Sequence, residues 1–469
     1  MEQLELSEVQ GFLISEYKEM SSSRYLLLQV TEAGNAKKFL TSVADRITNV
    51  TTQKENICQN IGFTSTGLRT LGLKEDNLHS FSREFREGMV TPHRQRLLGD
   101  FDGSDPSRWR WGGPANETVD LVLMVFGKNQ SVSDNHCTEL RGKFSSYGLK
   151  EVHQLDGITL PNDKEHFGFR YGISQPAIIG SGVVGMNNDN IKPGEFILGY
   201  KNEYKIYPDT PLLEEKQGNY ELLADDADGS GKKDLGRNGT YFVLRQLQQD
   251  VDGFWTFLNK KTKNEDGSLN PDESTKLAAK MMGRWPSGAP LVKHPDKDPG
   301  GISEDNDFNY IGTDKLGYKC PFGAHIRRAN PRDNFEETGP RESLKLTRRH
   351  RIIRRVRSYG GDFTGSATHH TPNEETGLLF GCFNANISRQ FEFIQYTWAN
   401  YPKFKQLYAD PDPFIGVREN PAPGVEQNFT IPQPTVNKII TDLKSFVTVK
   451  GGGYFFFPSI TAMKFLSTI

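Results

Sequence analysis

The sequence predicts a fold of mixed α and β elements arranged in two halves. Three observations lead to this prediction. Short apolar runs of strand length alternate with helical patterns in both halves of the chain. A stretch rich in Gly, Pro, Asn and Asp, from Gln175 to Leu235, lies between them. The 469 residues include 30 Phe and 16 Tyr, enough for more than one domain and a substantial core.

The first half reads as two cycles of strands and helices. Residues 11–17 and 24–30 are apolar runs of strand length, and residues 34–47 place Ala36, Phe39, Leu40, Val43 and Ile47 on one helical face. The second cycle comprises residues 57–73, the helix-like segment 79–89, and strands over 119–127 and 151–160. Such short elements suit an α+β ferredoxin-like unit at least as well as a doubly wound sheet. Periodicity alone does not choose between them.

The connector is predicted to be a loop, and the second half is predicted to contain further strands and helices. Asp226, Asp228 and Ser230 superficially resemble a calcium loop, but the twelfth-position Glu and the following helix are missing, so we interpret residues 224–236 as a loop. The second half predicts a strand leading into a helix, then a helix, two strands and a helix, over residues 240–261, 273–285, 343–360, 377–386 and 387–404. We therefore divide the chain into residues 1–235, which hold the connector, and residues 236–469.

Composition excludes several classes of protein. The 57 basic and 59 acidic side chains give a formal net charge of −2, which disfavours a nucleic-acid partner held by bulk positive charge. Cysteines at 58, 137, 320 and 382 form no C-x-x-C pair, which disfavours a disulfide framework and a four-sulfur metal site. The first residues have no signal-peptide pattern, and no apolar run is long enough to span a bilayer. We expect a cytoplasmic protein without a membrane partner.

One histidine has a distinctive setting. His325 lies in CPFGAHIRRANPR, where Pro and Gly residues fix the backbone on both sides. Arg327, Arg328 and Arg332 follow it, and a bound dianion would explain these cations. Haem fits that description, because its propionates need cations and its iron binds an imidazole. From these residues alone, a structural histidine in a turn is an equally good interpretation.

Several segments together resemble one family. AHIRRANPR resembles the proximal haem segment of the dye-decolourising peroxidases, and HFGFRYGISQP, residues 166–176, is similar to the segment that carries their Gly-x-x-Asp-Gly signature. RIIRRVRSYG, from Arg351, resembles the strand with the distal arginine. Residues 235–255 and 377–398 also read as family segments, in the family's order. The resemblance implies two ferredoxin-like lobes with antiparallel sheets flanked by helices, and haem b in the C-terminal lobe. The long spacing after His325 resembles the branch with larger loops.

The resemblance also implies roles for individual residues. His325 would bind the iron, with Asp410 or Asp412 orienting its imidazole. Arg354 would be the distal arginine. Further residues would contact the porphyrin or its propionates: Phe169, Ile173, Ser174, Arg328, Leu378 and Phe380.

Two departures fall on the distal side. Tyr171 stands where the family has aspartate, and Val356 stands where Arg-Arg-Gly is usual. A phenol is a poor base at neutral pH, whereas peroxide activation needs a proton to be moved. Four consequences stay open: a slower peroxidase that relies on Arg354, iron ligation by Tyr171, a pocket reshaped for other haem chemistry, or a Tyr171 that merely packs.

The leading hypothesis is a haem peroxidase that oxidises bulky phenolic or dye-like donors with hydrogen peroxide, as a monomer or homodimer. The alternative is a haem protein with oxygen activation, chemistry on an organic substrate, or haem binding with little turnover. The five Trp and the many Tyr residues include candidates for electron relays, but most Trp residues pack in cores, and the sequence does not select among them.

Overall fold

The computed structural model describes residues 3–186, 189–335, 339–370, 375–418 and 427–469. Its central feature is an antiparallel sheet that closes on itself in the strand order β1-β3-β2-β12-β7-β9-β8-β4. The strands are β1 (Ser22–Val30), β2 (Ile57–Phe63), β3 (Leu121–Gly127), β4 (Leu149–Ile158), β7 (Thr240–Gln249), β8 (Ile353–Tyr359), β9 (Thr376–Asn384) and β12 (Val447–Phe457). Two short pairs lie outside it: β5 (Ala177–Ile178) with β6 (Asn190–Ile191), and β10 (Phe429–Ile431) with β11 (Lys438–Ile440).

The two halves of the chain contribute four strands each in the same pattern. Read round the barrel from β4, the first half places its strands in the order 4-1-3-2, and the second half, β7, β8, β9 and β12 numbered in chain order, repeats 4-1-3-2 in the same direction. Each half has the βαββαβ sequence of elements that is typical of ferredoxin-like units. The prediction of an α+β fold with antiparallel sheets and flanking helices is confirmed.

The sequence did not predict how the two units are joined. Strand β2 meets β12 at Phe63 and Phe456, and β4 meets β8 at Ile158 and Ser358. These two seams turn two open sheets into one barrel, so the two ferredoxin-like units share an inner core. Closure also removes the unpaired edges that open sheets expose.

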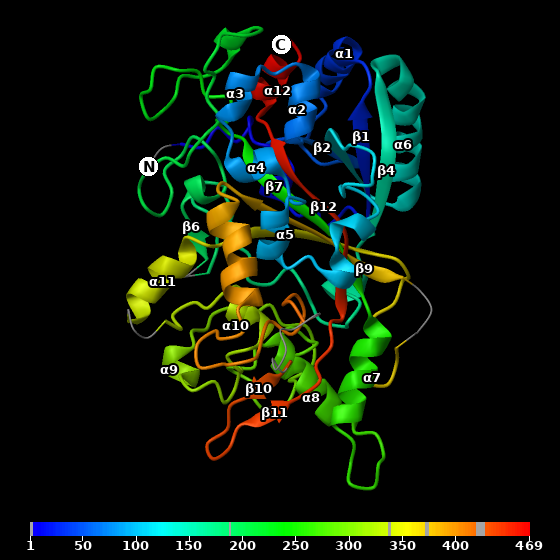
Figure 1. The fold of residues 1–469 in the computed structure, drawn as a ribbon, viewed down its shortest axis with the longest axis vertical. Coiled ribbons are helices and arrows are strands. Elements are labelled where there is room, and N and C mark those ends of the chain that lie inside the picture. Colours follow the sequence, from blue (N-terminus) through cyan, green and yellow to red (C-terminus); the bar gives the residue numbers. More distant parts are fainter. Residues whose placement is uncertain (1–2, 187–188, 336–338, 371–374, 419–426) are drawn as a thin grey trace.

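Helices cover the barrel and extend beyond it. Figure 1 shows α1, α2, α6 and α12 at one end of the molecule and α7 to α10 with β10–β11 at the other. The helices are α1 (Ala33–Ala44), α2 (Ser65–Leu71), α3 (Glu75–His79), α4 (Arg83–Glu87), α5 (Pro92–Leu98), α6 (Gln130–Phe144), α7 (Val251–Lys261), α8 (Pro271–Met282), α9 (Ile311–Asp314), α10 (His325–Ala329), α11 (Pro340–Arg348) and α12 (Ile460–Leu466). In the described part of the chain, no helix combines the length and apolar character that crossing a membrane requires.

Most predicted elements agree with the structure, and four differ. The apolar run 11–17, predicted as a strand, instead begins with the 3-10 helix η1 (Gly11–Leu13) and contains no strand. The predicted helical face of α1 is buried, and its N-cap Glu32 accepts backbone N–H bonds from Gly34 and Asn35. The helix-like segment 79–89 is interrupted between α3 and α4. The helix predicted from Ile387 is a π-helix in two pieces, η9 (Ser388–Glu392) and η10 (Ile394–Asn400), a wider form that is frequent at functional sites.

Strand β12 was not predicted, because three consecutive glycines weaken a strand pattern. The structure gives the reason for the first of them. A Cβ on Gly451 would lie 2.3 Å from the indole nitrogen of Trp111, so the ring packs directly on the strand backbone.

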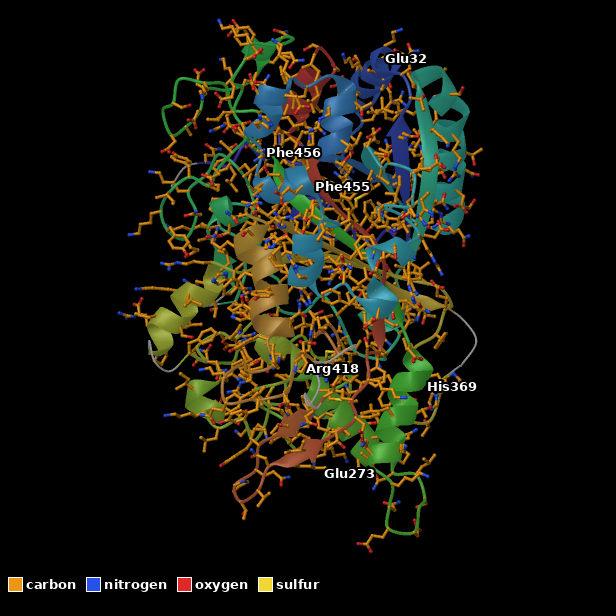
Figure 2. All side chains as sticks on the ribbon, viewed as in Figure 1. Glu32, Glu273, His369, Arg418, Phe455 and Phe456 are labelled. Carbon is orange, nitrogen blue, oxygen red and sulfur yellow. The ribbon has the colours of Figure 1, made fainter. Side chains whose placement is uncertain are left out.

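Aromatic side chains fill the barrel. Phe12, Phe126, Phe242 and Phe383 contact one another inside it, with ring centroids 4.5–6.3 Å apart. Successive residues of β12 point to opposite faces, so Phe455 joins this inner cluster whereas Phe456 joins the outer core beneath the helices (Figure 2). The rigid sheet holds the side chains on its remaining outward face in fixed positions.

Candidate active site

A cavity of about 300 Å³ lies against the sheet of the second half. Alternate residues of four neighbouring strands form one wall, as the period of two requires: Arg245, Leu247 and Gln249 of β7, Arg354 and Val356 of β8, Leu378 and Phe380 of β9, and Val447 and Val449 of β12. The facing wall comes from α10, η9–η10 and residues 414–418, and the segment 169–174 forms an edge. Ten of the residues singled out from the sequence as candidates or departures line this cavity: Phe169, Tyr171, Ile173, Ser174, His325, Arg332, Arg354, Val356, Leu378 and Phe380.

His325 is held with one ring nitrogen directed away from the cavity. It is the first residue of α10, and its Nδ1 lies 2.9 Å from Oδ2 of the buried Asp412. The other carboxylate oxygen of Asp412 accepts the backbone N–H groups of Phe414 and Ile415 at 2.9 and 3.0 Å. Burial opposes ionisation of Asp412, yet the neighbouring His325 and these donors hold its pKa below the ordinary value. Nε2 of His325 has no hydrogen-bond partner among the described residues and remains available to a ligand.

The structure separates the two candidate aspartates. Asp412 contacts His325, whereas the carboxylate of Asp410 accepts bonds from the backbone N–H and the hydroxyl of Thr430. Arg328 does not line the cavity in the described structure. Its guanidinium is fully buried and donates to the backbone carbonyls of Trp398, Tyr401 and Asp410. Arg328 therefore fastens the segment that carries Asp412.

Four other arginines gather along the cavity wall. Arg284, Arg332, Arg351 and Arg354 all line it, and burial and the neighbouring Arg332 lower the pKa of Arg284 to about 10. Burial and then Arg351 lower the pKa of Arg354. Among the described residues, Asp189, 2.9 Å from Arg351, is the one carboxylate that forms an ion pair with any of the four. Four guanidinium groups with one carboxylate ion pair among them favour the binding of an anion.

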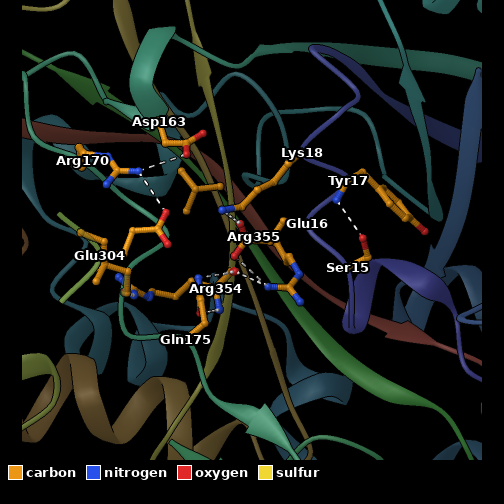
Figure 3. A network of polar contacts seen from close by, with 12 residues as sticks. Ser15, Glu16, Tyr17, Lys18, Asp163, Arg170, Gln175, Glu304, Arg354 and Arg355 are labelled. Carbon is orange, nitrogen blue, oxygen red and sulfur yellow. Dashed lines mark hydrogen bonds and ion pairs between the residues drawn. The ribbon is translucent and has the colours of Figure 1, made fainter. Parts of the chain in front are cut away.

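The signature segment is fixed to the edge of the cavity. Arg170 donates to the carbonyls of Asn162 and Ser303, both at 2.9 Å, and pairs with Asp163 and Glu304 (Figure 3). Gly168 has a φ of +98°, and a Cβ there would lie 2.3 Å from the carbonyl oxygen of Gly365, so this position requires glycine.

Sequence reasoning missed two buried carboxylates in this cavity. Glu165 accepts the backbone N–H groups of Phe167 and Phe169 at 2.9 Å, and a bond from Gln249, which ties the signature segment to β7. Asp100 pairs with Arg245, and both line the cavity. The alternation of β7 could have marked Arg245 and Gln249 as polar residues that share one face of the strand, but no sequence signal joined Glu165 or Asp100 to them.

Tyr171 lines the cavity, and its backbone N–H donates to the carbonyl oxygen of Asp163 in the segment that follows β4. Burial raises the pKa of its phenol, Arg357 lowers it, and Asp163 and Glu16 raise it. Arg357 belongs to the face of β8 opposite to Arg354, since residues of a strand alternate. The charged groups that act on the phenol, Arg357, Asp163 and Glu16, are not cavity-lining residues, and the hydroxyl stays protonated at neutral pH.

The residues present fit a haem group. The cavity walls are largely apolar, one imidazole offers a free nitrogen, and the arginines suit two carboxylates of one ligand. The described residues contain no group of three or more His, Cys, Asp or Glu side chains able to hold a bare metal ion. A metal ion held within an organic cofactor and by one imidazole would match this composition.

Known proteins share both sequence and fold with this chain. The family model described as the DyP dimeric alpha+beta barrel domain matches residues 10–161. "Peroxidase 2" of Mycetinis scorodonius is 30% identical over 98% of this chain and 87% of that protein. "Multifunctional dye peroxidase DyP2" of Amycolatopsis sp. is 28% identical over 87% of this chain and 81% of its own length.

Solved structures agree. An ancestral D-type dye decolorizing peroxidase superposes with a TM-score of 0.81 at 27% identity over the whole of both chains. A DyP-type peroxidase of Anabaena sp. gives 0.76 at 26% identity, covering 98% of this chain and 94% of that one. The chain therefore belongs to the dye-decolourising, or DyP-type, peroxidase family, whose members are haem-dependent oxidoreductases that act on peroxide.

Proposed function

We propose that this protein is a haem b peroxidase that uses hydrogen peroxide to oxidise bulky phenolic or dye-like donors. The observation that carries the proposal is the pairing of His325 with Asp412 on one wall of a cavity whose opposite wall bears Arg354. The names of the curated relatives, which include dye peroxidases, support the class of donor. We assign the cofactor to the second of two units, residues 236–469, with residues 1–235 forming the other.

Residues on the two sides of the cavity have different proposed roles. Haem, when bound, supplies the redox-active iron that exchanges electrons with peroxide and with the donor. His325 is the iron ligand, and its bond to Asp412 fixes the ring and makes the imidazole more electron-donating. Phe169, Ile173, Leu378 and Phe380 provide apolar contact and keep water out.

Arg354 is the electrostatic group of the distal side. Its Nη2 donates to the carbonyl oxygen of Ile173 at 2.6 Å, which fixes the guanidinium at the cavity wall. A fixed cation there stabilises the negative charge that develops on the departing peroxide oxygen. Val356 adds a β-branched side chain two residues further along the same wall and narrows the space beside Arg354.

The direct test is turnover with the haem-loaded protein. We expect oxidation of an anthraquinone dye and of a methoxyphenol that requires both the haem and hydrogen peroxide, measured by dye bleaching and product absorbance. A stable histidine-ligated haem spectrum without peroxide-dependent turnover would overturn the proposal. That result would favour a haem-binding protein with little chemistry.

The role of Tyr171 can be tested separately. In the proposed enzyme, residue 171 contributes no carboxylate, and a neutral phenol moves protons poorly. We expect Tyr171→Asp to raise the second-order rate constant for the reaction of haem with peroxide by about tenfold or more, measured by stopped-flow absorbance. Tyr171→Phe is the matched control, because it removes the hydroxyl without adding a carboxylate, and should leave the rate constant unchanged. An unchanged rate in Tyr171→Asp would direct attention to Val356.

A further inference from the structure

Glu16 is a carboxylate from the N-terminal segment that lies behind the signature segment. It follows the turn η1 (Gly11–Leu13) and precedes β1, far in sequence from the cavity residues. Its Oε1 is 3.4 Å from Nη1 of Arg355, and its Oε2 is 4.0 Å from Nζ of Lys18 (Figure 3). The backbone carbonyl of Glu16 also accepts a 2.7 Å bond from Arg357. Strand β8 therefore fixes both the backbone and the side chain of this residue.

Because residue 172 is a glycine, open space lies between Glu16 and the cavity. Gly172 lines the cavity with a φ of +80°. A Cβ on Gly172 would lie 3.6 Å from Oε2 of Glu16, and apart from its chain neighbours no other atom of the described residues would lie within 4 Å of it. The space beside Gly172 is therefore bordered by the carboxylate on one side and by the cavity on the other.

Glu16 acts electrostatically on the residues of the distal side. Glu16 raises the pKa of Arg354, and it does so more strongly than Asp189, the carboxylate paired with Arg351. It acts on Tyr171 and Arg355 in the same direction. The groups that face Glu16 are thus Lys18 on its own segment, Arg354, Arg355 and Arg357 on β8, and Tyr171 on the signature segment. Among the described residues, no other carboxylate raises the pKa of all three of Arg354, Arg355 and Tyr171.

We propose that Glu16 is the proton acceptor of the distal side, reached across Gly172, in place of the carboxylate that residue 171 lacks. The inference rests on the proposed function, because it requires haem between His325 and Arg354. A neutral acid that enters the cavity loses its proton to the Glu16 carboxylate through a water molecule beside Gly172. The bond between the acid and its proton breaks, and an O–H bond forms on the Glu16 carboxylate. The anion that remains faces Arg354.

Cyanide binding isolates this step from turnover. Hydrogen cyanide is a neutral acid that must lose its proton to bind ferric haem as an anion, and binding is read from the haem spectrum alone. The haem-loaded wild type, Glu16→Gln and Glu19→Gln are mixed with cyanide in a stopped-flow instrument between pH 5 and pH 8. Glu19 is the matched control, because it lies on the same segment, is exposed and loses the same charge.

The expected result is specific to Glu16. Since a positioned acid–base group typically contributes at least about 100-fold, and water replaces part of that, we expect Glu16→Gln to slow cyanide association by at least about tenfold at pH 7. Its dependence on pH should flatten, whereas Glu19→Gln follows the wild type. The double variant Glu16→Gln with Tyr171→Asp should recover the rate, because it returns a carboxylate to the signature.

Two outcomes separate the inference from the proposed function. Equal rates and equal pH profiles in the wild type and Glu16→Gln, with haem bound in both, would overturn the role of Glu16 and leave the peroxidase intact. A wild type that shows no cyanide-induced change in its haem spectrum would instead count against the haem site itself. If Glu16→Gln does not fold, Glu16→Asp decides: slower association supports the inference, and an unchanged rate refutes it.

Discussion

Replacing His325 with alanine is expected to abolish imidazole ligation of the haem and, with it, peroxidase turnover. The structure holds the ring in place through the buried Asp412 and leaves Nε2 free at the cavity wall. Because even the outer partners of metal-ligating histidines are worth roughly 10- to 100-fold, we expect loss of the ligand to lower kcat/KM by more than about 100-fold. Absorbance and electron paramagnetic resonance spectra of the haem-loaded variant measure the ligation.

The control for this variant is His79→Ala, at the exposed C-terminus of α3. It removes an imidazole from a position outside the cavity and should leave the haem spectrum unchanged. Added imidazole should partly restore the spectrum of His325→Ala by occupying the space of the missing ring. A His325→Ala protein that keeps the wild-type haem spectrum would refute the assignment of the ligand.

Replacing Arg354 with leucine is expected to slow the reaction with peroxide while leaving the haem bound. The side chain is the fixed cation of the sheet wall, and leucine keeps much of its apolar contact with neighbouring side chains. Removing one such preorganised group typically costs roughly 10²- to 10³-fold, and we expect a loss of this size in the second-order rate constant with peroxide. Stopped-flow absorbance at varied peroxide concentration measures it.

Arg354→Lys is the matched variant for this prediction. It keeps the charge but not the planar fork that reaches the carbonyl oxygen of Ile173, so its rate should lie between those of the wild type and Arg354→Leu. If Arg354→Leu reacts with peroxide as fast as the wild type, charge stabilisation comes from another group, and Arg351 or Arg245 would be the next residue to test.

The two distal departures have different structural settings. Val356 faces the cavity on the same strand as Arg354, so its bulk acts directly on the cavity space beside Arg354. Tyr171 also borders the cavity, but the charges that act on its phenol, Arg357, Asp163 and Glu16, are not cavity-lining residues. A substitution at residue 171 therefore changes the surroundings of these charged groups as well as the cavity lining. For this reason the stability of Tyr171→Asp against heat should be measured beside its rate.

The sequence by itself determined the type of most elements and marked many of the residues that line the cavity. The apolar spacing of residues 34–47 predicted α1. The setting of His325 among Pro, Gly and Arg distinguished one histidine out of ten. Both signals depend only on residues that are close together in the sequence. The resemblance then supplied a location for Arg354, Leu378 and Phe380, all of which line the cavity.

Only the tertiary structure decided between residues of equal chemistry. Asp410 and Asp412 are two positions apart, and Arg328 and Arg332 lie in one motif, so no pattern could tell which aspartate meets His325 or which arginine reaches the cavity. Glu16 and Arg355 are 339 residues apart in the chain and meet because the sheet closes. Contacts of this kind depend on how strands from both halves pair, which is a property of the whole barrel and not of any local run of residues.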